Sequence, residues 1–126
     1  MDERLKEHGA ISWSELLTSD VDAAKSFYGQ LFGWTYADAP VDDKTYTLVQ
    51  VNGEEVAGIM HTPPDAGQMP PAWGVYVTVD DVDAAAQKAV ALGGKVYLPP
   101  QDIPEVGRFC VIGDPQGASI SLITYR

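Results

Sequence analysis

The pentapeptide Asp-Val-Asp-Ala-Ala occupies residues 20–24, and the same five letters return at residues 81–85. A short apolar run precedes each copy, and a glycine follows each leading aspartate by thirteen residues, at Gly33 and Gly94. Each copy therefore predicts a strand, then a helix capped by an aspartate, then a glycine that ends the helix. A repeat of this kind indicates one supersecondary unit written twice, with the two halves sharing a core.

The sequence around each copy predicts the order β-α-β-β-β. Asn52-Gly53 favours a two-residue hairpin inside the first unit, and the proline-rich stretch at 62–71 connects the units. The predicted fold class is α+β, a single domain over residues 1–126 with units of about 10–61 and 72–126 and one helix per unit. We expect strands at 11–18, 34–37, 44–51 and 54–61 with a helix after Asp20, and at 74–79, 95–98, 108–112 and 118–124 with a helix after Asp81.

Each predicted helix carries one apolar stripe at helical spacing, which we expect to pack on the sheet. The second stripe consists of smaller residues and covers little apolar surface, which favours self-association of the chain as a homodimer. The stripes are Ala24, Phe27, Tyr28 and Leu31 in the first helix and Val82, Ala85, Ala89 and Leu92 in the second.

The composition fits one compact domain. The chain has 126 residues, 45% of them apolar, and two independent domains of about 60 residues would each be marginally stable. Eighteen acidic against eight basic side chains give a net charge of −10, so we expect neither nucleic acid nor an anionic membrane as partner, because both would be repelled. The charge favours a cationic ligand or serves solubility alone.

Cys110 is the single cysteine, so no internal disulfide is expected and a reducing, cytoplasmic location is indicated. It lies in an apolar run, which favours a buried core residue over a nucleophile. We expect no leader peptide, because the start of the sequence lacks a charged-then-apolar segment, and no apolar run approaches the ~20 residues of a membrane span. The polar first nine residues are expected to form a loose arm.

Short motifs outside the repeat point to a family. Phe-Gly-Trp ends the first helix, Val-Ala-Gly-Ile-Met forms the strand at 56–60, Pro-Pro-Ala-Trp opens the second unit, and Asp-Pro-Gln-Gly-Ala makes the turn at 114–118. Together with the repeat, they resemble the vicinal oxygen chelate superfamily of glyoxalase I, bleomycin-resistance proteins and extradiol dioxygenases, over residues 11–124. The resemblance implies that both units form a curved mixed sheet around a central cavity, with the helices outside and two chains in the functional particle.

The resemblance also says where metal-using relatives carry their ligands: a His or Gln on the first strand of each unit and a Glu on the last. The corresponding residues here are Trp13, Gly74, Ala57 and Ser121. None offers the imidazole nitrogen or carboxylate that a divalent ion requires. We therefore expect no metal and no cofactor, and the metal-dependent lyase, isomerase and ring-cleaving reactions of the superfamily are not expected.

A relocated metal site is the alternative. Glu15 shares a strand face with Trp13, while His61 and Glu55 have the parity of Ala57, so these three could converge as metal ligands. The simpler interpretation, which we favour, places His61 at an exposed strand end.

Glu15 is expected to point into the cavity beside Trp13, Leu17 and Tyr76. A carboxylate there would anchor a cation or act as a general base. Its alternative is a structural salt bridge to Arg108, and the sequence does not decide between these roles.

Three functions from different classes follow from these residues. The first is a binding module without metal, holding an aromatic or cationic organic ligand. The second is a lyase, isomerase or dioxygenase-like enzyme that works without metal, with Glu15 or His61 as base and Arg108 as charge stabiliser, or with the relocated metal site. The third is a regulatory or structural domain. The expected ligand-binding residues are Trp13, Glu15, Leu17, His61, Tyr76, Arg108, Phe109 and Ser121.

Overall fold

The computed structural model describes residues 2–41, 44–62 and 70–126. Its contacts divide the chain into two compact units. The first unit comprises residues 13–74, and the second unit comprises residues 75–126 together with residues 1–12. Much of the predicted connection at 62–71 lies outside the described residues.

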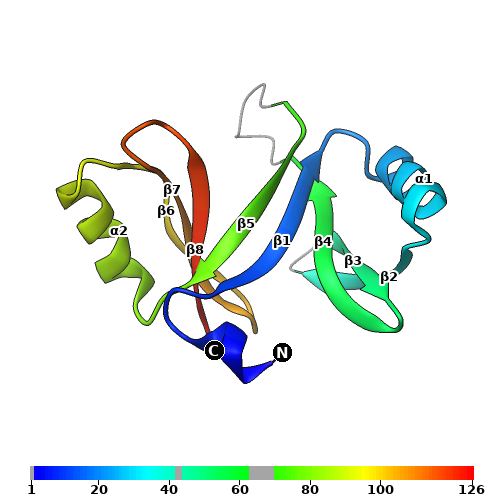
Figure 1. Cartoon of the computed structure of the whole chain (residues 1–126), viewed down its shortest axis with the longest axis horizontal. Coiled ribbons are helices and arrows are strands. Elements are labelled where there is room, and N and C mark those ends of the chain that lie inside the picture. The colour runs from blue at the N-terminus through cyan, green and yellow to red at the C-terminus, as the bar shows by residue number, and fades with distance from the viewer. Residues whose placement is uncertain (1, 42–43, 63–69) are drawn as a thin grey trace. The chain divides into compact units, whose positions relative to one another are not determined.

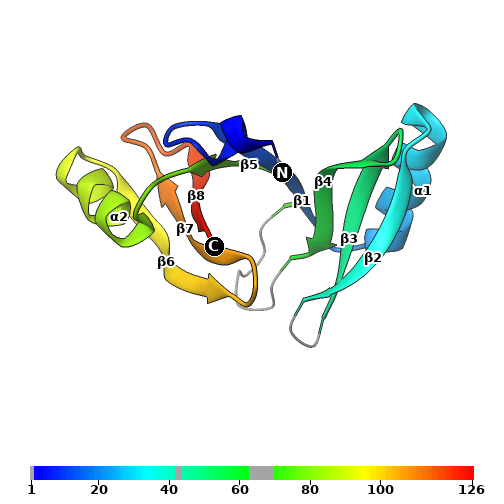
Figure 2. The same ribbon diagram turned by 90° about the horizontal axis from the view of Figure 1, so that it is seen from below.

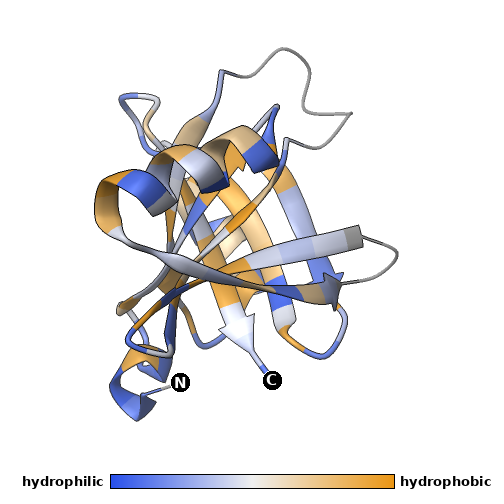
Figure 3. Cartoon of the chain, turned by 90° about the vertical axis from the view of Figure 1, so that its right-hand side faces the viewer, coloured by the Kyte–Doolittle hydropathy of each residue, from blue (hydrophilic) through white to orange (hydrophobic). Residues whose placement is uncertain are grey.

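The first unit is built from one helix and four strands (Figures 1 and 3). The strand order is β2-β3-β4-β1, with β1 parallel to β4 and the other pairs antiparallel. Figure 3 shows the helix lying across these strands. The elements are β1 (Ile11–Thr18, whose first two residues belong to the second unit), α1 (Val21–Phe32), β2 (Thr35–Val41), β3 (Lys44–Val51) and β4 (Glu54–His61).

The second unit repeats this plan (Figure 2). The strand order is β5-β8-β7-β6, with β5 parallel to β8 and the other pairs antiparallel. The predicted α+β class with two β-α-β-β-β units is confirmed, whereas the cavity that the resemblance implies stays a prediction. The elements are a short 3-10 helix (Glu3–Lys6), β5 (Ala72–Thr78, whose first three residues belong to the first unit), α2 (Val82–Ala91), β6 (Lys95–Ile103), β7 (Gly107–Gly113) and β8 (Ser119–Tyr125).

Both helices begin as the repeat predicts. The side chain of Asp20 accepts a hydrogen bond from the Ala23 amide at 3.0 Å, and that of Asp81 accepts one from the Ala84 amide at 3.1 Å. The helix ends differ, because α1 ends at Gly33 with φ 73° while in the second unit the left-handed residue is Gly93, with φ 95°, one position before the glycine of the repeat.

Two expected loops are partly strand. Residues 38–41 continue β2, and residues 99–103 continue β6, although each segment contains proline. Both strands lie at the outer end of their unit's strand order, where proline is tolerated because only one side of the strand is paired. The register shifts twice along β6, beside Leu98, which accommodates Pro99 and Pro100.

The first core is smaller than the helical stripe predicts. Ala24 and Tyr28 of α1 pack against the buried cluster, but Phe27 is 60% exposed and Leu31 is 59% exposed. The stripe is therefore wrong for these two residues, which face solvent on α1. The buried cluster is Leu16, Val49, Ala57 and Ile59.

The second core contains the single cysteine. Cys110 is fully buried, as expected, and burial raises the pKa of its thiol. Val82 and Ala85 of α2 pack there, but Leu92 is 70% exposed and does not. The cluster is Val79, Val82, Ala86, Cys110 and Leu122, with Val77, Ala85, Val96 and Ile112 packed against it.

The prediction that the first nine residues form a loose arm is also wrong, because hydrogen bonds attach them to β5 and to the residues that follow it. The Gly9 amide donates to the Thr78 carbonyl at 2.7 Å, and the Thr78 amide donates to the Ala10 carbonyl at 2.8 Å. The His8 ring accepts a hydrogen bond from the Asp80 amide at 3.0 Å.

Candidate functional site

Trp13, Glu15 and Leu17 lie on one face of β1, as predicted. Leu16 is buried in the core under α1, and side chains alternate along a strand. The neighbours of Leu16 therefore point to the opposite face, which we call the open face of the first unit. All three residues are partly exposed there.

A chain of hydrogen bonds connects this open face. The Trp13 indole Nε1 donates to the Tyr46 hydroxyl at 2.8 Å. The same hydroxyl donates to Glu15 Oε1 at 2.7 Å. Sequence reasoning missed Tyr46, although it has the parity opposite to the buried Val49 and Thr47 of β3.

Gly58 of β4 lies between β1 and β3 and gives the tyrosine ring its path. It pairs in register with Glu15 on one side and with Leu48 on the other. A β-carbon built on Gly58 would overlap the ring and hydroxyl of Tyr46. The ring of Tyr46 therefore crosses β4 where the strand has no side chain.

The second unit brings together Tyr76, Phe109 and Ser121. The rings of Tyr76 and Phe109 lie 6.3 Å apart with an interplanar angle of 48°, and Tyr76 pairs in register with Ser121. Cys110 and Leu122, one position further along their strands, are in the core. The three predicted residues therefore share the face opposite that core.

Arg108 lies on the other face, beside α2. Its Nε donates to Asp83 Oδ2 at 2.8 Å and its Nη2 to Asp83 Oδ1 at 3.0 Å, while Nη1 donates to Asp102 at 3.3 Å. These bonds raise the pKa of the guanidinium, and the guanidinium lowers the pKa of Asp83. A salt bridge to Arg108 is one of the two roles that the sequence leaves open for Glu15, but the structure pairs Arg108 with two aspartates of its own unit. Arg108 thus does not share the face of Tyr76 and Phe109.

His61 is an exposed strand end, as the favoured interpretation has it. It pairs in register with Thr18 and has the parity of the buried Ile59, whereas Glu15 lies on the open face. The convergence of His61 with Glu15 in a relocated metal site is therefore wrong.

The register also corrects one of the four family positions. Tyr76 pairs with Ser121, and Glu15, its counterpart 61 residues earlier, pairs with Gly58. Gly58 rather than Ala57 is thus the counterpart of Ser121.

A bulge explains this difference. The register between β3 and β4 shifts between Val49 and Gln50, where β4 contributes one residue more than β3. An extra residue in a bulge is invisible to a count along the sequence.

The corrected positions do not fit a divalent metal ion. An indole, a hydroxyl and two glycines supply neither a nitrogen lone pair nor a carboxylate. Within residues 2–41, 44–62 and 70–126, no three His, Cys, Asp or Glu side chains are grouped closely enough to hold one. The four positions are Trp13, Gly58, Gly74 and Ser121.

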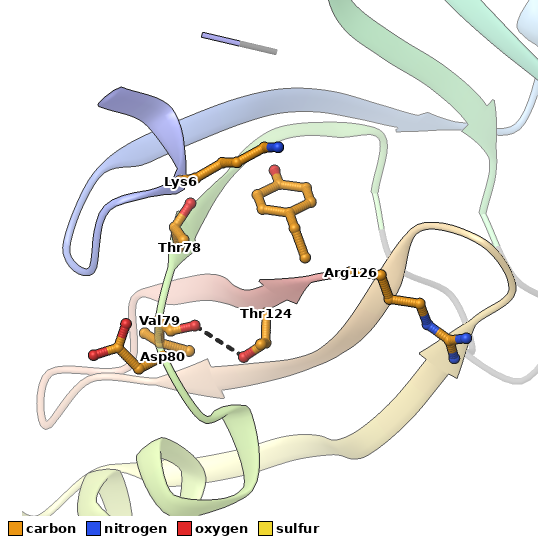
Figure 4. Close-up of a pocket in the computed structure, with 7 residues that line it drawn as sticks. Lys6, Thr78, Val79, Asp80, Thr124 and Arg126 are labelled. Carbon is orange, nitrogen blue, oxygen red and sulfur yellow. Dashed lines mark hydrogen bonds between the residues drawn. The ribbon is translucent and has the colours of Figure 1, made fainter. Parts of the chain in front are cut away.

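A cavity of about 320 Å³ lies within the second unit, and none of the predicted site residues lines it (Figure 4). Its wall includes the Thr124 hydroxyl, which donates to the Val79 carbonyl at 2.9 Å. Tyr125 also lines it and shares a 2.8 Å hydrogen bond with Ser12. The remaining lining residues are Lys6, Thr78, Asp80 and Arg126.

A family model described as the glyoxalase/bleomycin resistance protein/dioxygenase superfamily matches residues 10–122. The chain belongs to this superfamily. The resemblance seen in the sequence is thereby confirmed.

Two curated relatives of this glyoxalase superfamily member carry different names. CFP32 of Mycobacterium bovis, which carries the name of a glyoxylase, is 47% identical over 117 residues, covering 90% of this chain and 45% of the relative. The anthracycline biosynthesis protein DnrV of Streptomyces peucetius is 35% identical over 128 residues, covering 90% and 46%. The chain spans about half the length of the curated relatives it matches.

Solved structures share the fold. Methylmalonyl-CoA epimerase from Mycobacterium tuberculosis aligns with a TM-score of 0.60 at 18% identity, over 90% of this chain and 87% of that one. A variant of the Streptomyces coelicolor epimerase in complex with 2-nitronate-propionyl-CoA aligns with a TM-score of 0.65 at 15% identity, over 93% and 97%. In the part of the chain that the structure describes, no helix is long and apolar enough to cross a membrane.

Proposed function

We propose that this superfamily member binds a small organic molecule, aromatic or amine-bearing, against the open face of the first unit. The observation that carries the proposal is the hydrogen-bond chain from Trp13 through Tyr46 to Glu15. It holds a flat indole and a carboxylate on one sheet face. Stacking of a planar or cationic group on such a ring contributes about 0.5 to 2 kcal/mol, and Leu17 adds apolar surface beside it.

Glu15 suits an anchor better than a base. The Tyr46 hydroxyl donates to its Oε1 at 2.7 Å, which holds the carboxylate in place beside the indole of Trp13. A carboxylate fixed in this way attracts a cation. The only charge stabiliser that the sequence suggests for metal-free catalysis, Arg108, is held by Asp83 and Asp102 on the helix side.

Composition and one relative support the same ligand class. A net charge of −10 favours cations over phosphates and nucleic acid. DnrV is named for the biosynthesis of anthracyclines, which are planar aromatic compounds, and a planar ligand suits the indole of Trp13.

A thermal-shift screen of aromatic amines, aromatic neutral compounds, CoA esters and divalent metals tests the proposal. A ligand present at about a hundred times its Kd stabilises the folded protein by about 2.7 kcal/mol. Trp13→Ala should weaken the binding of any hit at least several-fold, whereas Trp73→Ala should not, because Trp73 contacts Tyr28 and Trp34 instead.

Glu15→Gln separates the classes of ligand and function. Cationic hits should lose affinity in this variant while neutral aromatic hits keep it. The proposal would be contradicted by anionic hits whose affinity is the same in wild type and Trp13→Ala. If the protein converts a hit to product without metal, and this turnover is lost in Glu15→Gln, the binding function is wrong and the metal-free enzyme replaces it.

We also propose that the chain self-associates as a homodimer through α1. The sequence suggests α2 as the poorly covered helix, but the larger exposed apolar side chains, Phe27, Leu31 and Phe32, lie on α1. Large exposed apolar groups gathered on one helix are typical of protein interfaces.

A further inference from the structure

We infer that Tyr46 is the positioning residue of the ligand site, and that Gly58 is a glycine in order to admit its ring. The inference rests on the proposed function of Trp13 and Glu15 and adds the residue that fixes both.

The direction of the hydrogen bonds is set by chemistry. An indole nitrogen is a donor only, so the Tyr46 oxygen must accept from Trp13. The single hydroxyl hydrogen of Tyr46 is then left for Glu15 Oε1, 2.7 Å away. The chain runs from indole through phenol to carboxylate, and hydrogen bonds in such a series polarise one another.

The sheet makes Tyr46 unable to reach Glu15 by an ordinary neighbour contact. Tyr46 stands on β3 and Glu15 on β1, with β4 between them, and neighbouring strands lie about 4.8 Å apart. The ring must therefore cross β4. Gly58, the register partner of Glu15, is the residue beneath it.

The backbone of Gly58 does not require glycine. The described glycines with positive φ are Gly9, Gly33, Gly53, Gly93 and Gly117, and Gly58 is not among them. An alanine would be acceptable to the backbone but would overlap Tyr46. Glycine at this buried position is therefore explained by the tyrosine ring.

The second unit offers a matched control. Tyr97 lies over Gly113 in the same manner, so a β-carbon on Gly113 would also overlap a tyrosine ring. The counterpart of Glu15 in that unit is Tyr76, so no carboxylate stands at this place. Displacing Tyr97 disturbs a tyrosine over a sheet without touching the proposed site.

The first measurement needs no ligand. The three indole N–H groups of the chain give separate signals in a ¹⁵N-labelled sample, and that of Trp13 is held by Tyr46. In Tyr46→Phe and in Gly58→Ala, the Trp13 signal should shift and its hydrogen exchange should accelerate. It should stay unchanged in Gly113→Ala and in Tyr36→Phe, which removes a hydroxyl bound to the Lys25 carbonyl. An unchanged Trp13 signal in Tyr46→Phe would overturn the inference.

The second measurement reads the carboxylate. With a ¹³C label on glutamate side chains, the carboxyl signal of Glu15 should shift in Tyr46→Phe, because the variant removes the hydroxyl that donates to Oε1. The same signal should stay in place in Gly113→Ala, which disturbs the other tyrosine. Tyr46→Phe is the conservative variant, so the test holds even where Gly58→Ala fails to fold.

The third measurement uses proflavine, a planar aromatic cation, as probe. Its affinity should fall about three- to tenfold in Tyr46→Phe, the range for one lost hydrogen bond, and stay constant in Gly113→Ala. If proflavine and the screened compounds do not bind at all while the Trp13 and Glu15 signals respond as stated, the proposed function fails, and only the statement that Tyr46 fixes Trp13 and Glu15 is retained. Proflavine binding that is equal in wild type and Tyr46→Phe would refute the positioning role alone.

Discussion

Single residues in this protein are constrained by what lies on each side of the sheet. Ile59 is completely buried against α1, whereas its neighbour Gly58 serves the opposite face. Two consecutive residues are thus constrained differently: Ile59 must fill a volume in the core, and Gly58 must leave room for the ring of Tyr46.

Ile59→Val should lower the free energy of unfolding by about 0.5 to 1.5 kcal/mol, because it removes one methylene from a closely packed position. Urea denaturation at neutral pH measures the change. Val90→Ala on α2 is a suitable control, since Val90 is 55% exposed and its truncation should have a much smaller effect. Equal losses of unfolding free energy in the two variants would contradict the placement of Ile59 in the core.

Cys110 should react with a thiol reagent only when the protein unfolds, because the thiol is fully buried and its pKa is raised. A thiol whose native pKa is raised stabilises the fold fully below the unfolded value of about 8.5, and this stability is lost as the pH rises further. Reaction with a disulfide reagent, timed with and without urea, measures the protection. Immediate reaction of the native protein would argue against a core position.

At the scale of elements, an ion pair connects α2 to β7. Asp83 in the first turn of α2 binds Arg108 through both carboxylate oxygens, which lowers the pKa of Asp83. A carboxylate with a lowered native pKa stabilises the fold above its unfolded value of about 3.9, and the stability is lost as the pH falls through the native value.

The repeat supplies the control for this ion pair. Asp83→Asn should reduce the difference in unfolding free energy between about pH 6 and about pH 2.5, measured by urea denaturation. Asp22→Asn, at the equivalent position of α1, should reduce it less, since the structure gives Arg108 to Asp83. An identical reduction in the two variants would rule out a specific contribution from Arg108.

The sequence predicted the elements better than the site because elements are local. Capping aspartates and strand periodicity placed both helices and every strand, with β2 and β6 too short because prolines suggested loops. Alternation along β1 placed Trp13, Glu15 and Leu17 on one face. Tyr46 was missed because its partners are two strands away, and Ala57 was chosen over Gly58 because a bulge cannot be counted from letters alone. Arg108 was placed on the wrong face for the ligand because Asp83 is a partner that only packing reveals.

At the scale of the whole molecule, the exposed apolar side chains of α1 govern assembly. Light scattering at micromolar concentration should give twice the 13.6 kDa of one chain. Leu31→Glu should return the particle to a monomer, because it places a charge in the proposed interface. Leu92→Glu changes a leucine at the C-cap of α2 that is exposed as well, at 70% against 59% for Leu31, and should leave the dimer intact. A monomeric wild type, or dissociation by Leu92→Glu alone, would contradict an α1 interface.

The prolines of the two outer strands affect whether copies of this chain aggregate by pairing strand edges. Pro40 in β2 and Pro99 with Pro100 in β6 lie on strands that end their unit's order. A proline removes an amide hydrogen at its position, which makes the strand a poorer template for an incoming strand. Fibril growth by edge addition is thereby discouraged at both outer strands. Folded copies then associate through side chains rather than through strand pairing. The chain can therefore expose the apolar side chains of α1 without strand-by-strand polymerisation of its sheets.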